Sequence, residues 1–236
     1  FFEKAKDFAV YPTVDNKYFT FAELKEKIKD QQTDKDGNLV VLYTSNEEEQ
    51  HAYIEEAKTK GYEILLLDSP IIAHLLQKIE GTEEKLSFVR VDSDHVENLI
   101  KKDEEQISKL NDEEKETLKT YLDEVIPKEK FSVQLEAMDS NTNPFIITEP
   151  EFMRRMKDMQ KTGGGGGMFG MGNLPEMYNL VVNTNHELVG EILNTKTQKK
   201  KERLVNQALD LARLSKNLLK GEELTAFIKR SYEMIK

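Results

Sequence analysis

The side chains that most often carry out chemistry in proteins are scattered along this chain and form no recognisable catalytic pattern. The 236 residues include no cysteine, which excludes a disulfide framework and a thiolate metal or redox site. No nucleophile–base pair can be inferred from residue spacing. The histidines lie far apart without the spacing of metal ligands, and we interpret each as a helix-surface or helix-end residue: His51, His74, His95 and His186. The sequence therefore predicts no catalytic residue, no metal site and no bound cofactor.

Three local features suggest ligand binding but have simpler explanations. The five glycines at 163–167 are not followed by Gly-Lys-Ser/Thr and do not come directly after a strand, which excludes a phosphate-binding loop and a dinucleotide fingerprint. Asp68 follows an apolar run, where the carboxyl end of a sheet could place a functional acid. Because Ser69 and Pro70 come next, Asp68 is better explained as the residue at a helix start. The lysines at 199–201 could bind an acidic surface but also fit a solvated connector.

The glycines lie within a segment that is unusually rich in methionine. Six of the eight methionines fall between positions 153 and 177. Phe152, Met153, Met156 and Met159 recur at spacings of three and four, which gathers them on one face of a predicted helix. Methionine is flexible and polarizable, so an exposed stripe of this kind suits promiscuous apolar contacts. From composition alone, the alternative is that the stripe is ordinary core and the glycines a passive connector.

Stepwise alternation of strands and helices predicts an α/β unit in the first 90 residues. Apolar runs of strand length alternate with capped helical segments, which is typical of a parallel sheet with crossover helices. The expected strands are 39–44 and 62–68, and 86–92 is either a further strand or the connector out of the unit. The expected helices are 18–31 (opened near Thr20, with Glu23 three residues on), 46–61 and 69–81.

A mixed region with a different composition begins near Asp92. Apolar spacing predicts one long helix over 96–110, and then a second helix that Pro127 ends. The other expected elements are strands at 131–137 and 144–148 joined by a turn, the methionine helix with Thr148 and Glu151 at capping-box spacing, a strand at 177–184, a helix at 186–193, a polar connector, and helices at 202–220 and 221–236.

The two terminal helices carry apolar faces wider than one helix–helix contact needs. Each buried large apolar side chain contributes about 1.5–3 kcal/mol, so exposing several of them would be costly. A hairpin that packs against its own copy as a four-helix bundle solves this, and packing on its own domain is the alternative. The residues expected at the dimer interface are Leu204, Ala208, Leu211, Ala212, Ser215, Leu218, Leu219, Leu224, Phe227, Ile228, Ser231 and Ile235.

Overall composition limits the class of partner. The formal net charge of −10 argues against general nucleic-acid binding, which needs a basic surface. No apolar run approaches the roughly 18 residues of a membrane span. The chain starts with Phe-Phe and enters a periodic segment almost at once, so we expect a fragment of a longer protein.

Four stretches in this order resemble the C-terminal half of the heat-shock protein 90 family of chaperones, in its bacterial HtpG type. They are FFEKAKDFAVYPTVDNKYFTFAEL, KGYEILLLDSPIIAHLLQKIEG, TEPEFMRRMKDMQ and RLVNQALDLARLSKNLLKGEELTAFIKRSYEMI. The resemblance covers essentially the whole chain, although the five-glycine insert departs from the family pattern. It implies an α/β fold followed by an α+β fold, with 1–90 as the C-terminal subdomain of the middle domain and 91–236 as the dimerization domain.

The same resemblance implies a cytoplasmic chaperone of protein folding and stress response that acts as a homodimer and binds partly unfolded client proteins. Client contact would involve Phe152, Met153, Met156, Met159, Met168 and Phe169. ATP and Mg would bind a missing N-terminal domain, so this segment would not hydrolyse ATP. Because the chain ends in Met-Ile-Lys, tail-dependent docking of tetratricopeptide co-chaperones is not expected.

Two other classes of function remain as alternatives. One is an α/β enzyme that handles nucleotides or sugars, with its site at the strand ends near Thr44 and Asp68. The other is a purely structural oligomerization module, which would form dimers without affinity for clients.

Overall fold

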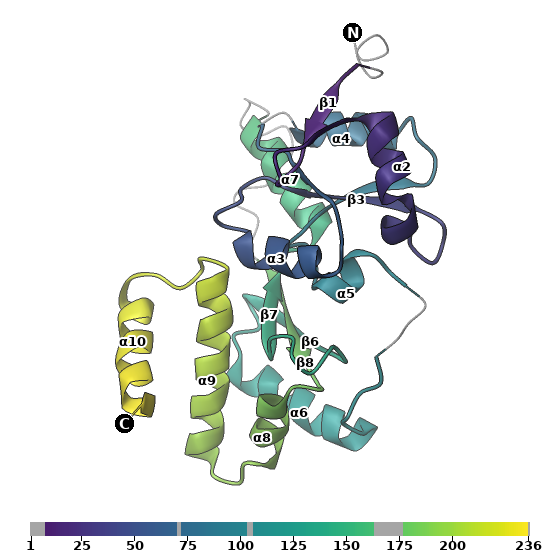
Figure 1. The fold of residues 1–236 in the computed structure, drawn as a ribbon. Helices are drawn as coiled ribbons and strands as arrows, with labels where there is room; N and C mark the ends of the chain where they lie inside the picture. Colours follow the sequence, from purple (N-terminus) through teal and green to yellow (C-terminus); the bar gives the residue numbers. More distant parts are fainter. Residues whose placement is uncertain (1–7, 70–71, 103–105, 163–176, 236) are drawn as a thin grey trace. The chain divides into compact units, whose positions relative to one another are not determined.

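The computed structural model describes residues 8–69, 72–102, 106–162 and 177–235, and for 157–162 the backbone alone (Figure 1). Contacts within the chain define two compact units. Unit 1 comprises Phe1–Asp103 with Glu149–Leu174, and unit 2 comprises Glu104–Thr148 with Pro175–Lys236. Each unit has its own sheet and its own hydrophobic core.

Unit 1 is built on a three-stranded parallel sheet in the order β4-β3-β5. Its strands are β3 (Leu39–Thr44), β4 (Ile64–Leu66) and β5 (Leu86–Arg90), with a separate antiparallel pair formed by β1 (Val10–Pro12) and β2 (Tyr18–Thr20). Its helices are α2 (Phe21–Gln32), α3 (His51–Thr59), α4 (Ile72–Glu80), α5 (Val96–Leu99) and α7 (Glu151–Thr162). The predicted strand–helix alternation and parallel pairing are therefore confirmed.

Local signals place the helices of unit 1. Thr20 and Glu23 form the predicted capping box, so α2 begins at Phe21. Gly61 adopts a φ of +77° just after α3, a conformation that glycine reaches without steric cost. The central strand β3 is almost wholly buried, as expected for a strand covered on both faces.

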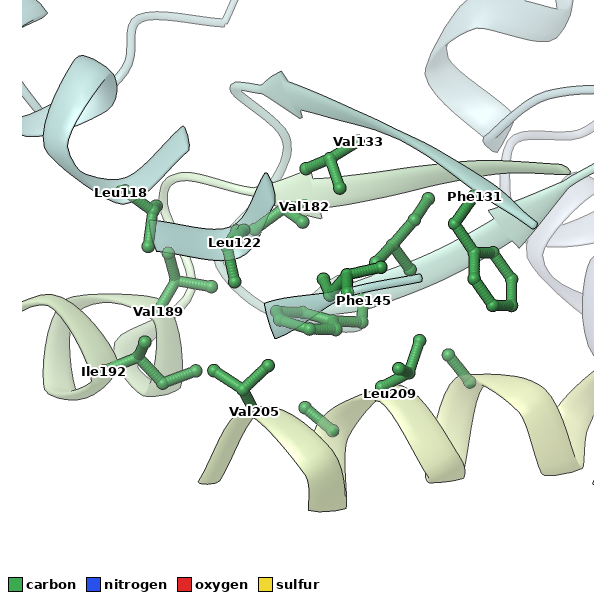
Figure 2. Packing of buried hydrophobic residues seen from close by; sticks show 14 of the residues in the cluster. Leu118, Leu122, Phe131, Val133, Phe145, Val182, Val189, Ile192, Val205 and Leu209 are labelled. Carbon is green, nitrogen blue, oxygen red and sulfur yellow. The ribbon is translucent and has the colours of Figure 1, made fainter. Parts of the chain in front are cut away.

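Unit 2 contains a three-stranded mixed sheet in the order β6-β8-β7. The central strand β8 (Tyr178–Asn183) pairs in parallel with β6 (Phe131–Glu136) and antiparallel with β7 (Phe145–Thr148). Helices α6 (Asp112–Val125), α8 (Glu187–Asn194) and α9 (Gln198–Ser215) contribute to one core with the sheet. Figure 2 shows side chains of these helices, including Leu122, Ile192 and Val205, directed toward Phe145 and Val182 of the sheet. Helix α10 (Gly221–Ile235) packs beside α9.

Two expectations for the region after Asp92 are wrong. The helix predicted over 96–110 ends at Leu99, and Asn111 instead caps α6 together with Glu114. The turn expected between these two strands is present, with the Thr142 N–H bonded to the Asp139 carbonyl at 3.0 Å, and β8 lies between β6 and β7 in the sheet. The polar connector is shorter than expected, since the lysines at 199–201 already belong to α9.

The start of α7 also differs from the prediction. A capping box between Thr148 and Glu151 would require the helix to begin at residue 149, whereas it begins at Glu151. Thr148 is the last residue of β7, and its buried hydroxyl has no hydrogen-bond partner among the described residues. The backbone carbonyl of Pro150 accepts the first helical bond, from the Arg154 N–H at 3.1 Å.

Candidate functional site

Helix α7 is fastened to unit 1 by its charged side. Arg154 is only 3% exposed, and its guanidinium donates hydrogen bonds to the Tyr43 hydroxyl and to the Glu151 carboxylate. The Tyr43 hydroxyl in turn donates to Glu151 Oε1 at 3.0 Å. Arg155 lies beside this group and binds Glu80 on α4 through two hydrogen bonds, of 2.6 and 3.0 Å. Ion pairs and hydrogen bonds therefore attach α7 to the rest of unit 1. In most helices the side that faces the core is apolar instead.

Burial and charge oppose each other in this network. Burial disfavours the charged form of Glu151, but the charges and hydrogen bonds of Arg154 and Arg155 outweigh it and hold the pKa of that carboxyl below its usual range. Burial, reinforced by the charge of Glu151, raises the pKa of the Tyr43 hydroxyl well above its usual value. Glu151 is therefore ionised and Tyr43 neutral at neutral pH. Loss of the Glu151 carboxylate would destabilise the fold, because the buried Arg154 guanidinium would keep its charge without this partner.

The apolar side of α7 is turned away from these anchors. Phe152 is 71% exposed, and Met153 and Met156 are half-buried. Met159 lies within α7, but its side chain is not among those described. Met168 and Phe169 lie outside the described residues. The structure thus brings together an anchored helix and an exposed aromatic ring, an arrangement that can bind apolar segments of another protein.

A second apolar surface lies on the terminal hairpin. Polar contacts join its two helices: Gln207 donates to Ser231 Oγ at 3.0 Å, and Arg230 donates to Asp210 Oδ2 at 2.6 Å. Large apolar side chains on the same helices remain exposed. They are Leu211 and Leu214 on α9, and Ile228, Tyr232, Met234 and Ile235 on α10.

The residues expected at the dimer interface fall into three groups. Ala208, Ala212, Leu219 and Phe227 are buried within the chain itself. Leu204, Leu218, Leu224 and Ser231 are half-buried. Leu211, Ser215, Ile228 and Ile235 are exposed. The hairpin thus contributes to its own unit and also presents an exposed face that a second copy could cover.

The strand ends near Thr44 and Asp68 do not form a comparable site. Thr44 is fully buried, and its hydroxyl donates a hydrogen bond to the side chain of Gln50. Asp68 is exposed. An open hollow of about 560 Å³ in unit 1 is lined instead by Asn38, before β3, and by residues 80–87, at the opposite end of the strands.

The histidines mostly mark helix starts. His51 is the first residue of α3, and His95 and His186 occupy the N-cap positions of α5 and α8. His186 Nδ1 accepts a hydrogen bond from the Leu188 N–H at 3.0 Å. Within the described ranges, no group of three or more His, Asp or Glu side chains could hold a metal ion. None of the described helices is long and apolar enough to cross a membrane.

Comparison with known proteins identifies the family. A family model described as Hsp90 protein matches residues 7–236. The chain belongs to the Hsp90 family. Its relatives include the Chaperone protein HtpG of Bacteroides thetaiotaomicron, 34% identical, and that of Bacteroides fragilis, 36% identical, each alignment covering the whole chain and 44% of the relative. The Chaperone protein HtpG of Porphyromonas gingivalis is 38% identical over 82% of this chain and 28% of its own length.

This Hsp90-family chain spans less than half the length of the curated relatives it matches. The family resemblance seen in the sequence is therefore confirmed for the segment. The residues that anchor α7 were missed by sequence reasoning. The spacing of Glu151, Arg154 and Arg155 does signal pairing along one helix face. Tyr43 and Glu80 lie 108 and 75 positions from their partners, and no local pattern points to them.

Proposed function

We propose that this segment is the self-association and client-contact part of a cytoplasmic Hsp90-type chaperone that acts in protein folding under stress. Full-length relatives carry the name chaperone, and the segment offers two exposed apolar surfaces. The observation that carries the client-contact role is Phe152, which is 71% exposed on a helix whose charged side is anchored. An apolar side chain held outward is available to bind the exposed apolar segments of unfolded chains.

The remaining parts of the proposal follow from the family. The methionine helix and the loop after it, with Met159, Met168 and Phe169, extend the contact surface begun by Phe152. The terminal hairpin pairs with a second copy as a four-helix bundle. ATP and Mg act in another domain of the full-length protein, so this segment binds clients without hydrolysing ATP.

Binding to a permanently unfolded protein tests the proposal. Reduced, carboxymethylated lactalbumin is a suitable probe, and the folded, disulfide-bonded protein is its control. We expect Phe152→Ser to weaken binding of the unfolded probe by about tenfold, since burying a phenylalanine contributes about 1.5–3 kcal/mol. Fluorescence anisotropy gives the dissociation constants.

Phe8→Ser is the matched control, because Phe8 is the same residue type in unit 1 and is 81% exposed. It should leave binding unchanged. If both variants bound the probe as tightly as the original chain, α7 would not be a client-contact surface. If the original chain bound no unfolded probe, a purely structural module would be the better interpretation.

A further inference from the structure

The outer edge of β5 is closed by side chains rather than by another strand. In a parallel strand, the N–H and C=O of one residue point to the same side, and this side alternates along the chain. Lys85 and Val91 bond to β3, through Leu39 N–H to Lys85 O at 2.8 Å and Val91 N–H to Tyr43 O at 2.9 Å. The backbone groups of Phe88 and Arg90 therefore point outward, where an edge strand normally meets solvent or another chain.

Three charged side chains satisfy three of these four outward groups, and Ser93 Oγ donates to the fourth, the Arg90 carbonyl, at 2.7 Å. Glu80 Oε1 accepts a hydrogen bond from the Phe88 N–H at 2.7 Å, and Arg155 donates to the Phe88 carbonyl at 2.7 Å. Glu151 Oε2 accepts from the Arg90 N–H at 3.4 Å. Helices α4 and α7 thus provide the partners that a neighbouring strand would provide.

Arg155 joins the three side chains into one cluster. Besides its two bonds to Glu80, it donates from Nε to Glu151 Oε1 at 2.7 Å. Its side chain is 20% exposed, and Glu80 and Glu151 are each 22% exposed. The planar guanidinium fork suits this arrangement, and an ammonium group could not reproduce it. Removal of Arg155 would leave two carboxylates close together and the Phe88 carbonyl without this donor.

These contacts fix the rotation of α7. Glu151 and Arg155 are one helical turn apart and both face β5, so Phe152 is held away from the sheet. We propose that Arg155 is a positioning residue, which closes the β5 edge and thereby holds the apolar side of α7 ready for unfolded chains. This inference rests on the proposed client-contact function. A surface held in its binding orientation loses less freedom when a partner binds.

Two measurements on the Arg155→Gln and Arg155→Lys variants test the proposal. The first is hydrogen exchange at the Phe88 and Arg90 amides without any client. The second is affinity for reduced, carboxymethylated lactalbumin. We expect Arg155→Gln to speed exchange at both amides by about tenfold, as loss of one charge-assisted hydrogen bond implies. Affinity should fall by about fivefold as the orientation of α7 is lost. Arg155→Lys should give the same changes in smaller size.

Arg203→Gln is the matched control, since Arg203 is a more exposed arginine in unit 2, whose nearest carboxylate is at 3.9 Å. It should change neither quantity. Unchanged exchange in both Arg155 variants would overturn the closed-edge cluster. Faster exchange with unchanged affinity, or weaker affinity with unchanged exchange, would overturn positioning. If Arg155→Gln does not fold, Arg155→Lys decides.

The exchange measurement needs no client, so it stands apart from the proposed function. Loss of probe binding in Phe152→Ser remains the test of that function. Suppose that Arg155→Gln speeds exchange while Phe152→Ser binds the unfolded probe as tightly as the original chain. This result would refute client contact and positioning, but it would leave the closed edge standing.

Discussion

Glu151 receives hydrogen bonds from three side chains and one backbone amide, more than any local sequence pattern would assign to a first-turn glutamate. Its donors are Tyr43, Arg154, Arg155 and the Arg90 N–H. The helix-internal pairs could be predicted from spacings of three and four. Tyr43 and Arg90 could not, because only the folded sheet brings β3 and β5 under α7. At the residue scale, the sequence therefore predicts the pairs within α7 but not the partners that lie far away along the chain.

The lowered pKa of Glu151 predicts a defined dependence of stability on pH. A carboxyl whose pKa is lower in the folded state stabilises that state above its unfolded pKa, near 4.5, and this contribution is lost as the pH falls through the folded value. Glu151→Gln removes it. Urea unfolding should therefore show a gap of about 1–3 kcal/mol between the original chain and Glu151→Gln at neutral pH, narrowing below about pH 4.

An exposed glutamate provides the comparison for this measurement. Glu48 lies in the turn before α3 and is exposed, so Glu48→Gln should differ little from the original chain at either pH. A gap for Glu151→Gln that stayed constant from neutral to acidic pH would show that the carboxylate charge does not anchor α7.

At the scale of single elements, local signals gave several boundaries and the parallel pairing of unit 1, but not the strand order of unit 2. The strand at 39–44 has the predicted bounds, and the capping box at Thr20 opens α2 as expected. By contrast, the order β6-β8-β7 is set by long-range pairing, since β8 pairs in parallel with β6 and antiparallel with β7. The predicted helix over 96–110 is wrong because the backbone becomes extended at Ile100, directly after Leu99, and apolar spacing alone does not show this end; the second helix, expected after 110, does begin at the Asn111 cap.

The cap of α6 can be tested directly. Asn111 Oδ1 accepts from the Glu114 N–H, and Glu114 Oε2 accepts from the Asn111 N–H, both at 2.9 Å. We expect Asn111→Ala to lower the free energy of unfolding by about 1 kcal/mol, the usual contribution of an N-cap, as measured by urea denaturation. Asn206→Ala, in the exposed interior of α9, should be neutral or slightly stabilising because alanine is the better helix former. Equal effects of the two substitutions would contradict the capping role.

At the scale of the whole molecule, contacts group the chain in a way that linear reading does not anticipate. The sequence places a boundary between residues 90 and 91, and this division into family domains stays a prediction. The chain instead passes three times between the compact units, so that Glu149–Leu174 returns to unit 1. Composition changes along the chain reveal where a region begins, but a return of this kind depends on the contacts of α7 with β3, α4 and β5.

The proposed self-association belongs to the scale of the whole molecule, and point variants test it better than truncation. Removal of both terminal helices would strip Val205, Leu209 and Ala212 from the core of unit 2 and could unfold it. Ile228, 44% exposed on α10, is the better target. Across a twofold axis one substitution acts at two places. Ile228→Asp should therefore weaken the dimer by about 100-fold or more, since a buried unpaired charge and the loss of apolar burial add to at least about 3 kcal/mol.

Light scattering over a range of concentrations measures this effect. Ala226→Asp adds the same charge to the same helix, at an exposed position on the side opposite Ile228, and should leave the dimer intact. Circular dichroism of both variants checks that α10 is retained. A monomeric mass for the original chain at all concentrations would refute self-association. A dimer that Ile228→Asp and Ala226→Asp affected equally would place its interface away from the exposed apolar face of the hairpin.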